Sequence, residues 1–130
     1  MIKHCFIVTS AINSKFGVYK PEERLQQTLD TVTSIKTRIP DAKIVIMEVT
    51  GVPITPAQEQ ALRSACDVFV DCTNDEEVKD LYQSENWDIV KNGTEIMCFG
   101  RVLAILKQEG QLEGIDRVHK MSGRYQLNDM

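Results

Sequence analysis

Residues that could contact a ligand lie at or just past the carboxyl end of each of four short apolar runs in this chain. They are Thr9, Ser10 and Asn13 for the first run, Glu48 and Thr50 for the second, Asp71 and Thr73 for the third, and Lys120, Ser122, Gly123 and Arg124 for the fourth. The carboxylates of Glu48 and Asp71 suit hydrogen bonds from a ribose hydroxyl or a base N–H. Lys120 and Arg124 suit phosphate oxygens, which an arginine can bind with two parallel hydrogen bonds. Gly123 lets the backbone approach a ligand closely.

Each of these residues also has an interpretation that needs no ligand. Glu48 is equally typical of a solvated strand end, and Asp71 of a residue that caps the following helix. Ser122 and Gly123 have the composition of an ordinary turn. Lys120 and Arg124 are also typical of surface charges.

A second dense group of polar residues lies at residues 86–95, with the sequence NWDIVKNGTE. It precedes an apolar helical pattern, and free N–H groups at a helix N-terminus suit an anion such as phosphate. Lys91 would add positive charge there. The alternative is that Trp87 is an apolar anchor and that the rest is a capped helix start.

The apolar runs have the composition of buried β-strands. They span residues 4–12, 42–49, 67–71 and 115–121. The first two read HCFIVTSAI and AKIVIMEV, and such continuous runs are typical of parallel strands covered on both faces. The fourth run is less apolar than the others.

Helical patterns separate these strands. Pro21, at the favoured first position, begins a helix over residues 21–39 with an apolar stripe at helical spacing. Thr55 to Gln58 form a capping box ahead of a second helix, and Thr73 with Glu76 predicts another ahead of a short helix to residue 84. A longer helix begins near residue 87 or 92, is strongest over 93–108, and ends at residue 108.

This alternation predicts an α/β fold, a three-layer sandwich around a mostly parallel four-stranded sheet, Rossmann-like in arrangement. Open parallel sheets bind ligands at the carboxyl ends of their strands, near the point where strand order reverses. We therefore expect the polar residues that follow the four runs to share one edge of the sheet.

Length and composition narrow the class of protein. A chain of 130 residues with 42% hydrophobic and 26% charged residues predicts a single globular domain over residues 1–130. The net charge of −4 argues against nucleic acid as a partner, because that requires basic stripes. The apolar runs are too short to span a membrane, and no signal peptide pattern begins the chain. We therefore expect a cytoplasmic protein.

Several familiar motifs are missing from the sequence. It contains no G-x-G-x-x-G after the first strand, no P-loop and no G-x-S-x-G elbow, which argues against dinucleotide oxidoreductases, P-loop NTPases and α/β-hydrolases. The four cysteines form no C-x-x-C pair, so a zinc site is not expected. We expect Cys5, Cys66 and Cys98 to be buried apolar residues.

The pattern as a whole resembles a known family. FIVTSAI in the first strand, Glu48, Asp71, and the phrases ENWDIVKNGTE and HKMSGRYQLND are similar to the nucleotide-binding half of GT-A-type glycosyltransferases, in particular glycosyltransferase-like proteins of bacteria and of tailed phages of cyanobacteria. The likeness covers nearly the whole chain, and its motifs are moderately specific.

The resemblance implies a site for a nucleotide diphosphate sugar. It implies that Thr9 and Ser10 lie near the nucleoside, that Glu48 and Asp71 contact ribose and base, and that the helix from about residue 93 packs under the ligand. GT-A enzymes usually hold Mn²⁺ or Mg²⁺ with an Asp-x-Asp after the fourth strand. Here that place reads KMSGRY, and Asp129 is the next carboxylate. Either Lys120 and Arg124 replace the charge of the metal, or the site does not take a sugar diphosphate.

Two functions therefore remain open. One is a glycosyltransferase-like domain that binds a nucleotide sugar, with no catalytic residue identified. In that family the acceptor half and the catalytic base usually follow this point, so we expect this chain alone to be incomplete or inactive as an enzyme. The alternative is a non-catalytic α/β module that acts as a homodimer through an exposed sheet edge, or through a protein partner.

Overall fold

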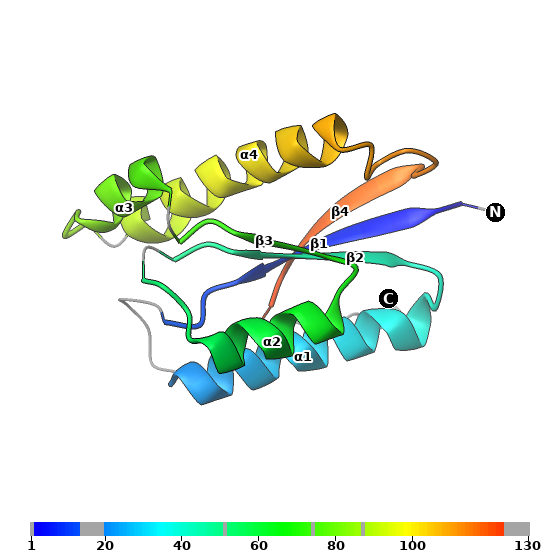
Figure 1. Cartoon of the computed structure of the whole chain (residues 1–130), viewed down its shortest axis with the longest axis horizontal. Helices are drawn as coiled ribbons and strands as arrows, with labels where there is room; N and C mark the ends of the chain where they lie inside the picture. Colours follow the sequence, from blue (N-terminus) through cyan, green and yellow to red (C-terminus); the bar gives the residue numbers. More distant parts are fainter. Residues whose placement is uncertain (1, 14–19, 51, 74, 87, 124–130) are drawn as a thin grey trace.

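The protein folds around one parallel sheet, in a computed structural model that describes residues 2–13, 20–50, 52–73, 75–86 and 88–123. The strands are β1 (His4–Ser10), β2 (Lys43–Glu48), β3 (Val68–Asp71) and β4 (Arg117–Ser122), arranged in the order β3-β2-β1-β4 (Figure 1). All three strand pairings are parallel.

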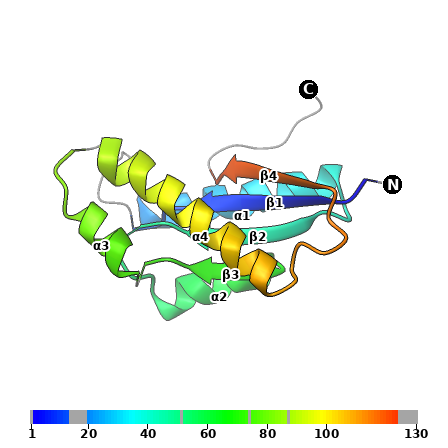
Figure 2. The same ribbon diagram turned by 90° about the horizontal axis from the view of Figure 1, so that it is seen from above.

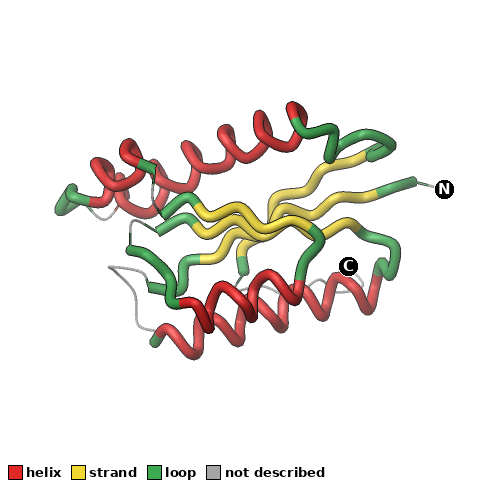
Figure 3. The backbone as a smooth tube through the Cα atoms, viewed as in Figure 1, coloured by secondary structure: helices red, strands yellow, loops and turns green. Residues whose placement is uncertain are grey.

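Helices cover both faces of this sheet. Helices α1 (Pro21–Arg38) and α2 (Pro56–Ala65) lie on one face. On the other lie α3 (Glu76–Tyr82), the π-helical turn η1 (Ile89–Gly93) and α4 (Thr94–Gln108), as Figures 1 and 2 show. The predicted three-layer α/β, Rossmann-like architecture is confirmed. The tube in Figure 3 shows the two helical layers on either side of the strands.

The strand order explains which helices lie on which face. From β1 to β3 the chain moves stepwise to one side, and it then returns past β1 to place β4 on the other side. Because parallel crossovers are right-handed, reversing the direction transfers the helices to the opposite face. The reversal puts the topological switch point between β1 and β4.

Two apolar clusters hold the layers together. Cys5 and Ile7 of β1 belong to a cluster that includes α4, whereas Phe6 and Val8 belong to a cluster that includes α1. This alternation confirms that β1 is covered on both faces. Ile44, Ile46 and Val45 of β2 are also fully buried, each at about 1.5–3 kcal/mol of hydrophobic stabilisation.

The helix starts confirm two of the predicted signals. Pro21 is the first residue of α1, and Thr55 forms the predicted capping box with Gln58. The prediction that Thr73 caps α3 is wrong, because the Asp75 carboxylate accepts the N–H groups of Glu77 and Val78 at 2.9 and 3.1 Å. A carboxylate is the stronger acceptor at this helix start.

Other predicted boundaries shift by a few residues. The fourth strand starts at Arg117, because the N–H groups of Asp116 and Arg117 both bond to Lys3 O in the turn before it. Cys5 and Cys98 are buried as expected, whereas Cys66 is only half-buried. Among the helices of the described residues, none combines the length and apolar character that a membrane span requires.

Candidate functional site

The carboxyl ends of the four strands meet at one edge of the sheet. Ser10 lies beside Glu48 and Glu48 beside Asp71, while Thr9 pairs with Ser122. The pairing continues just past the strands, since the N–H of Gly123 donates to Thr9 O at 2.8 Å. The fold thus brings together polar residues that lie up to 113 positions apart in sequence, as the strand-end pattern predicts.

Alternation along the strands divides these residues between the two faces. Ser10 and Glu48 follow Val8 and Ile46 on the face covered by α1 and α2. Thr9, Lys120 and Ser122 are on the face covered by α4. The candidate residues are therefore neighbours along one edge but form two groups, one on each side of the sheet.

Glu48 is the most unusual residue of this edge. Its side chain is 0% exposed, which rules out a solvated strand end. Oε1 accepts the N–H of Ile12 at 3.0 Å, and Oε2 has no hydrogen-bond partner in the described structure. Burial raises the pKa of this carboxyl to about 8, more than the Ile12 hydrogen bond lowers it. Glu48 is thus mostly protonated at neutral pH.

The hydroxyl of Ser10 lies beside this carboxyl. Ser10 is 1% exposed, and its nearby Oγ also lowers the pKa of Glu48. Nevertheless, neither Ser10 Oγ nor Glu48 Oε2 makes a hydrogen bond of normal geometry to another described residue. Buried polar atoms without partners are rare in native proteins, so each of them requires a physical explanation.

The turn after β1 is tied to two neighbouring elements. The Asn13 amide donates to Pro53 O at 2.9 Å and to Gln58 Oε1 at 3.2 Å. The Arg24 guanidinium of α1 donates to Ala11 O at 3.2 Å. Sequence reasoning missed Arg24, although its place in the first turn of α1, directly after the strand-end loop, was a usable signal.

Gly123 is required by packing within the protein. It is buried, and a Cβ at this position would lie 2.6 Å from Thr9 O and 2.7 Å from Thr28 Oγ1 of α1. The ordinary-turn interpretation therefore misses its role, which is a close approach between the end of β4 and helix α1. Thr28 also lies outside the sequence-based list of site residues.

Two charged candidates already have partners. Lys120 Nζ lies 2.5 Å from Glu95 Oε1 of α4, in a partly exposed ion pair. Asp71 Oδ1 accepts the N–H and the O–H of Thr73 at 2.9 and 2.6 Å. Asp71 therefore stabilises the turn after β3 and does not cap α3. These contacts fix the position of both side chains.

The predicted anion site at residue 93 is not a free helix end. Gly93 has helical torsions, and η1 runs directly into α4. The first N–H groups, of Asp88 and Ile89, donate to Asn86 Oδ1 at 3.0 and 3.3 Å. The start is capped, as in the alternative interpretation, which leaves fewer N–H groups for a phosphate. Trp87, the apolar anchor of that interpretation, lies outside the described residues.

The remaining predicted site residues lie outside what the structure describes. These are Arg124, Asp129 and the side chain of Lys91. Within the described residues, no group of three or more His, Cys, Asp or Glu side chains is arranged to hold a metal ion. The expectation of Mn²⁺ or Mg²⁺ therefore has no support from described side chains.

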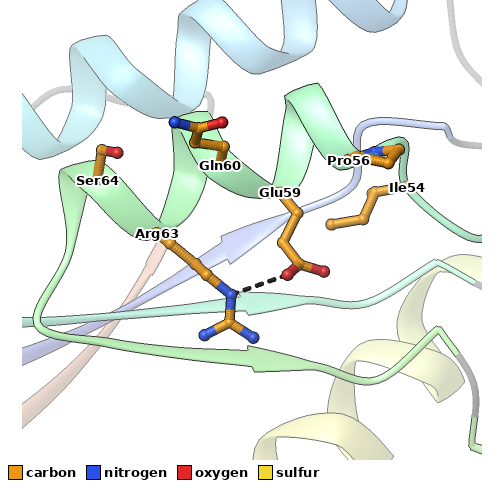
Figure 4. A pocket seen from close by; sticks show the side chains of 6 residues that line it. All are labelled: Ile54, Pro56, Glu59, Gln60, Arg63 and Ser64. Carbon is orange, nitrogen blue, oxygen red and sulfur yellow. Dashed lines mark hydrogen bonds and ion pairs between the residues drawn. The ribbon is translucent and has the colours of Figure 1, made fainter.

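A separate depression of about 470 Å³ lies along α2 (Figure 4). It is lined by Ile54, Pro56, Glu59, Gln60, Arg63 and Ser64. Arg63 Nε bonds Glu59 Oε2 at 3.0 Å, and its guanidinium also lies 5.0 Å from the ring centroid of Phe69. These contacts already satisfy the one cation of the depression, and none of the strand-end residues lines it.

Comparison of the chain with family models, with curated proteins and with solved structures finds no match. The interpretation of the site therefore depends on its own geometry.

Proposed function

We propose that this chain binds a nucleotide diphosphate sugar at the carboxyl ends of β1 and β4, as a glycosyltransferase-like domain. The observation that carries the proposal is the strand order β3-β2-β1-β4, which reverses between β1 and β4. Ligands of open α/β sheets bind at this reversal. Here it is bordered by Thr9 and Ser122, which are paired across the two strands.

In this proposal the two groups of polar residues have different roles. Ser10 and Glu48 are buried beneath the edge, so they support the β1 end and do not contact the ligand. Ser122 and Lys120 are the candidates for ligand contact, and Thr9, which is 7% exposed, positions the β1 end beside them. Lys120 would exchange Glu95 for a phosphate oxygen, and Arg124 would add a second cation.

The resemblance to GT-A-type glycosyltransferases implies glycosyl transfer to an acceptor as the reaction. We assign no catalytic residue, because none of the described side chains is placed against a reacting group. Since no metal-holding group is found among the described residues, no step is assigned to Mn²⁺ or Mg²⁺. The proposal concerns recognition of the nucleotide and its phosphates.

Thermal unfolding in the presence of UDP, GDP, CDP and their sugars, with and without Mn²⁺, tests the proposal. A ligand present at 100 times its dissociation constant adds about 2.7 kcal/mol of stability. We expect a rise in melting temperature with at least one of these ligands, and a smaller rise in Lys120→Ala and Arg124→Ala. Lys107→Ala is the matched control, because Lys107 is an exposed lysine in the last turn of α4.

The outcomes separate clearly. A rise that Lys107→Ala retains and the other two variants lose supports phosphate recognition at the end of β4. A rise that needs Mn²⁺ points to a metal bound through the ligand and Asp129. No change with any nucleotide at millimolar concentration would overturn the proposal.

The alternative, a homodimer without catalysis, is favoured by one observation. β4 is an edge strand, and Val118 on it is 40% exposed. An open strand edge is a template for pairing with a second chain. Light scattering over a range of concentrations tests this alternative, and a monomer at all concentrations would contradict it.

A further inference from the structure

The carboxyl of Glu48 is buried and contacts no ligand in the proposed site. Few neighbouring groups would compensate for its negative charge. It is fully buried, and in the described structure it forms no ion pair and one hydrogen bond, from the N–H of Ile12. The charged groups that act on it are Asp71 at the end of β3, which opposes its ionisation, and Arg24 of α1, which favours it. An uncompensated buried charge is unfavourable, so these surroundings favour the neutral form of the carboxyl.

The segment that Glu48 binds is the turn after β1. Ile12 is 0% exposed, and the flanking residues Ala11 and Asn13 bond Arg24 and Pro53. Ile12 is the residue whose backbone Glu48 contacts directly. The turn leads out of the β1 end, at the strand reversal where the proposed nucleotide would lie.

Ionisation of Glu48 would act on this turn in a definite direction. The N–H of Ile12 would bond a carboxylate more strongly than a neutral carboxyl. Burial nevertheless outweighs this bond, since the net effect of the surroundings raises the pKa of Glu48 to about 8. The protein relieves a buried charge most readily by letting it reach water, and the turn at Ile12 is the segment whose backbone this carboxyl binds directly.

We propose that Glu48 is a positioning residue whose neutral carboxyl holds the turn at residues 11–13 closed, and that opening of this turn releases a proton and weakens nucleotide binding. The second part rests on the proposed function. The first part concerns the chain alone and can be tested without a ligand.

Hydrogen exchange of the Ile12 amide tests the closed turn. When the turn is open, the Glu48 carboxyl reaches water and has its ordinary pKa. The equilibrium constant for opening therefore rises by up to tenfold per pH unit above about pH 4.5. The rise ends near pH 8, where Glu48 also ionises with the turn closed. We expect the protection of Ile12 to fall up to 100-fold between pH 5.5 and 7.5 in the wild type. Glu48→Gln, which mimics the neutral carboxyl, should show protection that is independent of pH.

The wild type and the variants are compared at the same pH, because the intrinsic rate of amide exchange itself rises with hydroxide concentration. Glu59→Gln is the matched control, because Glu59 is a carboxyl of α2 paired with Arg63 and half-exposed. It should keep the wild-type profile. If Glu48→Gln does not fold, carbon-13 NMR of the wild-type carboxyl gives the titration directly, and a midpoint near 4.5 would overturn the proposal. An Ile12 profile that is the same in the wild type and Glu48→Gln would also overturn it.

Nucleotide affinity tests the second part. We expect the dissociation constant of the wild type to rise with pH between 6 and 8, by up to tenfold per unit once the open turn dominates, and that of Glu48→Gln to stay constant. Equal profiles would overturn this link. If no nucleotide binds at any pH, the proposed function fails, whereas the Ile12 exchange profile still decides whether Glu48 holds the turn.

Discussion

The two ends of the β-sheet treat polar groups in opposite ways. At the amino end, His4 Nδ1 lies 2.8 Å from His119 Nε2, and the N–H of Lys3 donates to Asp116 Oδ2 at 2.7 Å. At the carboxyl end, Ser10 Oγ and Glu48 Oε2 are buried without hydrogen-bond partners among the described residues. Strand β1 thus shares paired groups with β4 at its amino end, whereas at the carboxyl end it and β2 carry the unpaired groups.

This difference indicates that the amino end of the sheet contributes stability, whereas the carboxyl end is the candidate for ligand binding. Paired polar groups at the amino end hold β1 and β4 together across more than 110 residues of sequence. Leaving a buried polar atom unpaired costs about 1–3 kcal/mol, so the carboxyl end is less stable than its packing allows. These unpaired groups lie at the carboxyl end of the sheet, which is the end where open α/β sheets bind ligands.

Among single substitutions, the largest loss of stability is expected at Gly123, where the end of β4 approaches its neighbours most closely. Gly123→Ala should lower the free energy of unfolding by about 3 kcal/mol, because the new Cβ would lie 2.6 Å from Thr9 O and the neighbouring backbone must move. Urea unfolding measures the change.

Gly100→Ala provides the control for this substitution. Gly100 is exposed within α4 and has nothing within 4 Å of an added Cβ, so alanine should stabilise the helix by about 0.5–1 kcal/mol. Equal effects at positions 100 and 123 would contradict the close approach of β4 to α1.

The pH dependence of stability tests the buried carboxyl. The folded-state pKa of Glu48, about 8, lies above that of the unfolded chain, so the folded state holds the extra proton. Its contribution to stability is full below about pH 4.5 and is lost as the pH rises through 8, at up to about 1.4 kcal/mol per unit. Denaturant unfolding should show this decline in the wild type and a flatter curve in Glu48→Gln. A wild-type curve that rises over this range would contradict the raised pKa.

The amino end should respond to acid in the opposite direction. Burial, then the charges of His4 and Arg117, lower the pKa of His119. Neutral His119 therefore contributes fully to the free energy of unfolding above pH 6.5, the usual pKa of histidine, and this contribution is lost as the pH falls below it. The loss should stay under about 1 kcal/mol because the ring is only partly buried and solvent screens its charge. His119→Phe keeps a ring against Phe6, 4.6 Å away, and should remove the acid dependence.

The smallest expected effect concerns the ion pair between Lys120 and Glu95. Exposed pairs contribute about 0–1 kcal/mol, so Glu95→Gln should hardly change the free energy of unfolding. It would, however, free Lys120 for a phosphate. We expect calorimetry to show tighter nucleotide binding by Glu95→Gln than by the wild type. Weaker binding would argue that Lys120 does not contact the ligand.

Local signals predicted much of the fold. Continuous apolar runs identified the strands, and Pro21 and the Thr55 capping box located two helix starts. Where local signals competed, prediction failed: at α3 both Thr73 and Asp75 were available as caps, and the carboxylate prevailed. The start of β4 was misplaced because it depends on Lys3, more than 110 residues away.

The sequence by itself determined the alternation of strands and helices and the polar residues that end each strand, because periodicity and capping act over a few neighbouring residues. Only the tertiary structure decided that β1 lies between β2 and β4, and therefore where the strand order reverses. It also decided that Glu48 is buried and neutral and that Gly123 packs against Thr28. These properties depend on solvent exclusion and on contacts between distant segments, which no short stretch of sequence specifies.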